Sequence, residues 1–60
     1  MIITRFENIA DIRKDSIVLD MPYPVRPDEY VEIDGESMIV VSTSWVIETG
    51  KPIELVVRVK

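Results

Sequence analysis

The side chains best suited to chemistry in this sequence are two carboxylates, Asp34 and Glu36, which flank Gly35. A carboxylate pair at that spacing could hold a cation or share a proton. The chain has no histidine and no cysteine, so general acid–base work would fall to carboxylates, lysine or tyrosine. Asp-Gly is also a strong turn signal, and a solvated turn explains both carboxylates. We therefore predict a protein that is not an enzyme, with no catalytic residue.

Two other kinds of site are excluded by spacing. The segment EIDGES (residues 32–37) lacks the ligand positions of a calcium-binding loop. The only glycines, Gly35 and Gly50, fall in separate turns, so there is no glycine-rich loop to hold a phosphate. We expect neither a metal site nor a cofactor.

Acidic residues gather in one stretch of the chain. They are Asp28, Glu29, Glu32, Asp34 and Glu36. They could form an acidic surface that binds a basic partner, or a solvated strand face whose charges prevent edge-to-edge pairing. The net charge of −4 argues against binding a nucleic-acid backbone, which needs clustered lysine and arginine.

The elements that must position these residues are strands. Alternating apolar residues and β-branched side chains predict five of them, at residues 1–7, 16–21, 30–34, 38–48 and 52–60. Residues 8–15 could form one helical turn or a loop. The last three strands predict an antiparallel meander that turns at Asp34-Gly35 and at Thr49-Gly50. The predicted fold is all-β, a small five-stranded antiparallel barrel or strongly bent sheet comprising one domain, residues 1–60.

The two turns predict a strand register. A two-residue loop at Asp34-Gly35 would oppose Ile33 to Glu36, and a four-residue loop would oppose Ile33 to Met38. A two-residue loop at Thr49-Gly50 opposes Ser44 to Leu55. Side chains alternate with period two, so the register defines an inward set. That set is Val31, Ile33, Met38, Val40, Val46, Ile53, Leu55, Val57 and Val59.

The opposite face of the long strand is also apolar, with Ile39, Val41, Trp45 and Ile47 joined by Val56. A one-sided sheet would carry polar residues there. Three explanations remain open. A bulge at residues 42–44 could turn Trp45 inward and Val46 outward, the N-terminal strands could cover this face, or the face could be an interface.

The connector between the second and third strands contains Pro22, Pro24 and Pro27, which interrupt any ladder and keep it extended. Tyr23 and Tyr30 border this connector. A groove for proline-rich ligands needs aromatic and acidic side chains together. Side chains of the right types are Trp45, Tyr23, Tyr30, Asp28 and Glu29.

Size and composition limit the class of protein. The chain has 60 residues, 47% of them hydrophobic, which is enough for a core but leaves stability marginal. Without disulfides, extra stability must come from packing or oligomerisation. There is no signal peptide pattern and no apolar run that could span a bilayer. A soluble, cytoplasmic protein with no membrane partner is expected.

The run MPYPVRPDEYVEIDGESMIVVSTSWVIETGKPIELVVRVK (residues 21–60) resembles small SH3-like β-barrel proteins encoded by phages and mobile elements. The shared pattern is a proline-containing lead-in, a short strand ending in a glycine turn, a long strand with a tryptophan, and a valine-rich last strand. The resemblance implies an SH3-like barrel and assigns no functional residue.

Two functions remain open. The first is a non-enzymatic intracellular binding protein that acts by protein–protein contact, such as an accessory or inhibitor protein of a phage or mobile element. The second is an oligomer-forming structural protein, a homodimer or a ring, that could sequester a small ligand. The predicted contact residues are Tyr23, Asp28, Glu29, Tyr30, Glu32, Ile39, Val41, Trp45 and Ile47.

Overall fold

The computed structural model describes residues 1–60 and contains five strands and no helix. The strands are β1 (Ile2–Asn8), β2 (Ile17–Met21), β3 (Tyr30–Ile33), β4 (Glu36–Val46) and β5 (Glu54–Val59). Each begins and ends within two residues of its predicted bounds, because the β-branched alternation that predicted it also packs it against its neighbours. The all-β prediction is confirmed.

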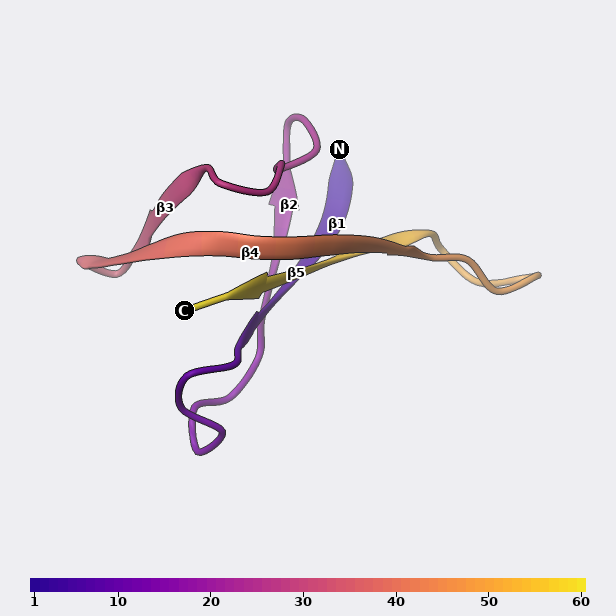
Figure 1. The fold of residues 1–60 in the computed structure, drawn as a ribbon. Helices are drawn as coiled ribbons and strands as arrows, with labels where there is room; N and C mark the ends of the chain where they lie inside the picture. The colour runs from indigo at the N-terminus through magenta and orange to yellow at the C-terminus, as the bar shows by residue number, and fades with distance from the viewer.

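The strands form one sheet in the order β2-β1-β5-β4-β3. Figure 1 shows how strongly it curls, since β4 and β5 run steeply across the direction of β1 and β2. We call the face that carries the core concave and the other face convex. Three of the four strand pairings are antiparallel, but β1 and β5 pair in parallel. The prediction of a purely antiparallel sheet is therefore wrong at this one pairing, which joins the two ends of the chain.

The C-terminal meander is confirmed. Its first turn has the register of the two-residue loop, one of the two alternatives, with Ile33 opposite Glu36 and Val31 opposite Met38. Asp34 and Gly35 both have positive φ, 52° and 83°, as a type I′ turn requires. The two residues suited to that backbone thus fix the pairing of β3 with β4.

The second hairpin differs from its predicted register by one residue. Val40 pairs with Val59 as predicted, but a bulge between Val40 and Ser42 shifts every later pair. The turn is also longer than the predicted two residues, and the Lys51 N–H donates to the Glu48 carbonyl at 3.1 Å. The bulge lies just before residues 42–44, where one of the three explanations placed it. It turns Trp45 inward and Val46 outward, as that explanation predicted.

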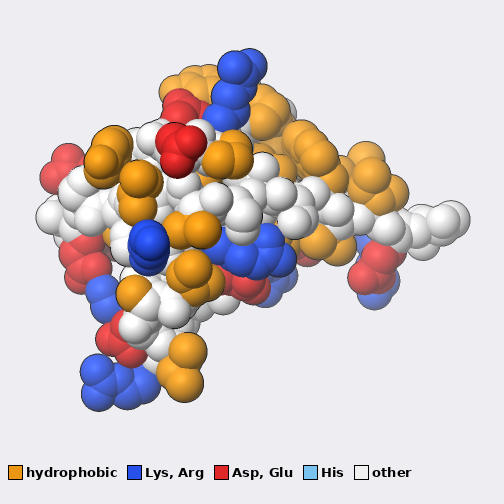
Figure 2. Space-filling model, viewed as in Figure 1, with side chains coloured by type: hydrophobic (Ala, Val, Ile, Leu, Met, Phe, Trp, Pro, Cys, Tyr) orange, Lys and Arg blue, Asp and Glu red, His pale blue; other side chains and the backbone are white.

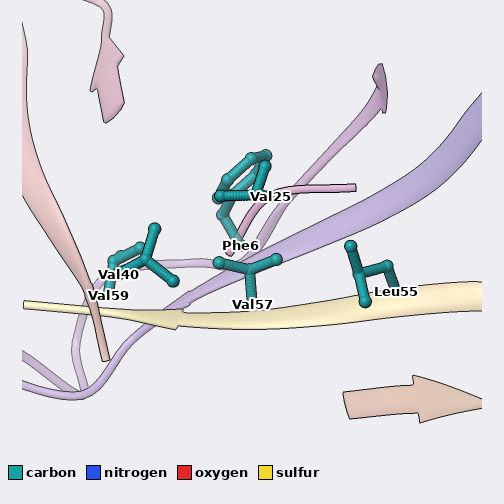
Figure 3. Packing of buried hydrophobic residues seen from close by; sticks show 6 residues of the cluster. All are labelled: Phe6, Val25, Val40, Leu55, Val57 and Val59. Atoms are coloured by element: carbon teal, nitrogen blue, oxygen red, sulfur yellow. The ribbon is translucent and has the colours of Figure 1, made fainter. Parts of the chain in front are cut away.

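The core lies on the concave face, where six side chains are buried together: Phe6, Val25, Val40, Leu55, Val57 and Val59. Figure 3 shows Phe6 and Val25 together above Val57, Val40 beside Val59, and Leu55 at one end. The connector after β2 therefore contributes Val25, which the sequence pattern did not mark. It is held there because the Asp28 N–H donates to the Val40 carbonyl and the Val40 N–H to the Glu29 carbonyl, both at 2.8 Å.

Most of the predicted inward set is confirmed. Val31, Ile33 and Met38 are partly buried against the core. The prediction that Val46 points inward is wrong, because the shifted register pairs Val46 with Glu54 on the convex face. Ile53 precedes β5 and keeps half of its surface exposed.

Residues 9–16 form a loop rather than a helical turn. The side-chain oxygen of Asn8 accepts hydrogen bonds from the N–H groups of Ala10 and Asp11, both at 2.9 Å. The Lys14 N–H donates to the Asp11 carbonyl at 3.2 Å. A local Asx turn therefore satisfies the backbone that a helix would otherwise have used.

Candidate protein-binding surface

Trp45 lies on the concave face, directly opposite Leu55 in the β4–β5 ladder. Paired residues of neighbouring strands share a face, and Leu55 is a core residue with 2% of its surface exposed. Trp45 nevertheless keeps 51% of its surface exposed, because it stands at the end of the core, where no further element covers it. The sheet thus leaves a large aromatic side chain half in water.

Trp45 belongs to a row of side chains that crosses four strands. The ladders place Leu19 opposite Thr4, Thr4 opposite Leu55, and Leu55 opposite Trp45. Thr4 is fully buried and its hydroxyl donates to the Ile2 carbonyl at 3.1 Å. The two middle members are closed off from water, whereas the two end members, Leu19 and Trp45, are exposed.

Two more exposed apolar side chains lie within two residues of the Trp45–Leu55 pair along the chain. Ile47 follows the end of β4 and Ile53 precedes β5, and both are exposed. Figure 2 shows hydrophobic side chains along the upper right of the molecule, between the top, where β1 begins, and the β4–β5 hairpin at the right. We name the set Leu19, Trp45, Ile47 and Ile53 the open-end surface.

The convex face carries cross-strand contacts between charged and polar side chains. Arg5 Nε lies 3.1 Å from Glu54 Oε1. Arg58 Nη1 donates to the hydroxyls of Ser42 and Ser44 at 3.4 and 3.2 Å. These cross-strand contacts surround the buried Val56, whereas Val18, Tyr30 and Val46 of the same face are exposed.

The structure does not bring the predicted contact residues together. Tyr30 pairs with Ile39 on the convex face near the β3 edge, whereas Trp45 lies on the concave face. From Ile39 to Trp45 the chain runs about 20 Å along β4. A groove combining Tyr30 with Trp45 therefore does not form in this fold.

The remaining predicted contact residues lie at three separate places. Tyr23, Asp28 and Glu29 are exposed on the connector, Glu32 is exposed on β3, and Val41 is at the bulge. Ile47 is the one predicted residue that joins Trp45 in the open-end surface. Leu19 and Ile53 were not predicted as contact residues, because their exposure depends on how far the sheet closes.

Two carboxylates of the acidic stretch have hydrogen-bond or ion-pair partners. Glu29 accepts the Arg26 N–H at 2.6 Å, and Glu36 binds Lys14 at 2.5 Å. Glu36 raises the pKa of Lys14, first through the hydrogen bond and then through its charge. Asp34 is therefore a turn residue, and the carboxylate of Glu36 is paired with the ammonium group of Lys14.

That ion pair spans a cleft of about 460 Å³ between the loop at residues 9–16 and the β3–β4 hairpin. Its apolar wall is formed by Phe6, Ile17, Ile33, Met38 and Val59, and its polar rim by Asn8, Arg13, Lys14, Asp15, Asp34 and Glu36. No group of three or more acidic side chains lies close enough to hold a metal ion. The cleft marks where the sheet fails to close into a complete barrel.

Comparisons of the chain with known protein families, with curated proteins and with solved structures find no match. The resemblance to SH3-like phage proteins stays a prediction. The structure has no helix long and apolar enough to cross a membrane.

Proposed function

We propose that this protein is a non-enzymatic binding module that acts by protein–protein contact through the open-end surface. The observation that carries the proposal is the half-exposed Trp45 beside the buried Leu55. Tryptophan is the side chain most enriched among the residues that dominate binding energy at protein interfaces. A partner that covers Trp45 would extend the core outward by one more row.

The surroundings of Trp45 support this use. Its neighbours in the open-end surface are aliphatic, and the nearest charged residues of the hairpin, Glu48 and Lys51, pair with each other at 3.0 Å. A partner therefore meets an apolar centre with few unpaired charges to desolvate, and desolvating charges is what commonly weakens an interface. The partner class that fits is a protein offering an apolar side-chain cluster, with specificity set at the polar rim.

An affinity-capture experiment with matched variants tests the proposal. The wild-type chain, Trp45→Ala and the control Ile12→Ala would be immobilised and exposed to extract from the source cells. Ile12 is 92% exposed in the loop at residues 9–16, outside the open-end surface, so its truncation also removes a large exposed apolar side chain. We expect a partner that is retained by the wild type and by Ile12→Ala and lost with Trp45→Ala. Equal retention by all three would contradict the proposal.

A further inference from the structure

Strand β2 is an unprotected sheet edge. It pairs with β1 on one side only, so the N–H and C=O groups on its other side have no strand partner. Four of its five residues are exposed, among them Val18 at 52% and Leu19 at 41%. Its only charged residue is Asp20. It has no proline, lysine or bulge, the features that usually prevent an edge from pairing with another chain.

The opposite edge of the same sheet is protected. Strand β3 follows Pro27 and carries Glu32, and its flanking residues Glu29 and Asp34 are acidic. Two copies that met at β3 would bring like charges together. The contrast between the two edges shows that β2 is the edge open to addition of a strand.

We propose that β2 pairs with the β2 strand of a second copy of this chain, antiparallel, about a two-fold axis through Leu19. In this arrangement Ile17 opposes Met21 of the second copy, and each Val18 opposes an Asp20. The two Leu19 side chains meet on the concave face. The single charge on each strand therefore faces a valine and not its own equivalent, so the strand is complementary to itself.

A second copy is also favoured by the continuity of the core rows. Leu19 is the exposed end of the row that runs through Thr4 and Leu55 to Trp45. Pairing at Leu19 joins two such rows into one across a ten-stranded sheet. An isologous contact of this kind closes on itself and produces a dimer rather than a fibre.

The exposed area is consistent with a small interface. The chain exposes 4448 Å², whereas a folded monomer of this mass typically exposes about 4,000 Å². The excess is about half of the ~800 Å² that each partner buries in a standard interface. Interfaces of this small size are typical of weak, transient dimers.

Charge substitutions at Val18 test both the dimer and its register. Val18→Asp places two Asp–Asp pairs across the axis and should raise the dissociation constant about tenfold or more. Val18→Lys places two Lys–Asp pairs there and should leave it unchanged or lower. Sedimentation equilibrium over a concentration series measures both values.

Urea unfolding of both variants separates a folding defect from loss of the dimer. Val18 lies opposite Arg5 in the β1–β2 ladder. The charge contact with Arg5 is therefore favourable for aspartate and unfavourable for lysine, the reverse of the order expected for the dimer. Dimerisation by Val18→Asp as tight as that of the wild type overturns the proposal, as does equal weakening by both variants.

Hydrogen exchange of the unmodified protein gives a second measurement. The outward-facing amides of β2 should become more protected as the concentration rises, while the amides of β3 should not change. A wild-type chain that stays monomeric to about 0.5 mM, with β2 exchange independent of concentration, overturns the proposal. The dimer buries Leu19, one member of the open-end surface, but Trp45 stands at the opposite end of that row, so Trp45→Ala should abolish partner capture and leave the dimer intact.

Discussion

Trp45 and Leu55 are direct partners across β4 and β5, yet Leu55 is 2% exposed and Trp45 51% exposed. The boundary of the core thus passes between two side chains of one cross-strand pair. The bulge between Val40 and Ser42 creates this relationship. Without it, the side-chain alternation of β4 would place Trp45 on the convex face.

Truncating Trp45 should cost the monomer little stability. Removing a buried tryptophan typically costs about 3–5 kcal/mol, and a half-exposed one loses correspondingly less, about 1–2 kcal/mol. Leu55→Ala is the matched control, since it removes a buried member of the same pair and should cost about 2–4 kcal/mol. Urea unfolding of both variants measures the two values, and a larger loss for Trp45→Ala would show that the indole is a core residue.

Gly35→Ala should destabilise the protein by about 1 kcal/mol through the backbone alone. Gly35 has φ +83°, and a Cβ added there would meet no atom within 4 Å. Strain is therefore the only cost, and thermal unfolding should show it. Asp34→Asn is the control, because asparagine tolerates the positive φ of residue 34 equally well and should leave stability unchanged.

Local sequence signals predicted the local parts of the fold. Alternation located the five strands, and Asp34-Gly35 fixed the β3–β4 register, because turn chemistry and strand period act over a few residues. The register shift at Val41 is also local. Val41 lies within an apolar run, however, and no residue type there marks the position of a bulge.

The remaining errors concern contacts between distant segments. The parallel pairing of β1 with β5 joins the two ends of the chain, and no short pattern encodes it. Val25 looked like a connector residue, and its burial depends on the path of the prolines around it. The open-end surface was predicted only at Trp45 and Ile47, because the exposure of Leu19 and Ile53 depends on how far the sheet closes.

Val25→Ala should destabilise the protein by about 2 kcal/mol, as expected for a buried valine. Val25 is 5% exposed and packs against Phe6 and Val57. Val46→Ala is the matched control, because Val46 is 38% exposed on the convex face and should cost less than about 0.5 kcal/mol. Equal losses of unfolding free energy for the two variants would show that the connector is not part of the core.

The ion pair between Lys14 and Glu36 should make stability depend on pH in the alkaline range. Glu36 raises the pKa of Lys14 above the ordinary value of 10.5. A raised folded-state pKa means that the folded chain holds its proton more tightly than the unfolded chain. The contribution is therefore complete below pH 10.5 and is lost as the pH rises through the higher folded-state pKa.

Lys14→Met should remove this part of the loss of stability at alkaline pH. Lys60→Met is the matched control, since Lys60 lies near no carboxylate within ion-pair distance. Urea midpoints between about pH 8 and pH 11.5 should fall less steeply for Lys14→Met than for the wild type or Lys60→Met. Parallel slopes for all three would show that the ion pair across the cleft does not hold the loop at residues 9–16 against the β3–β4 hairpin in solution.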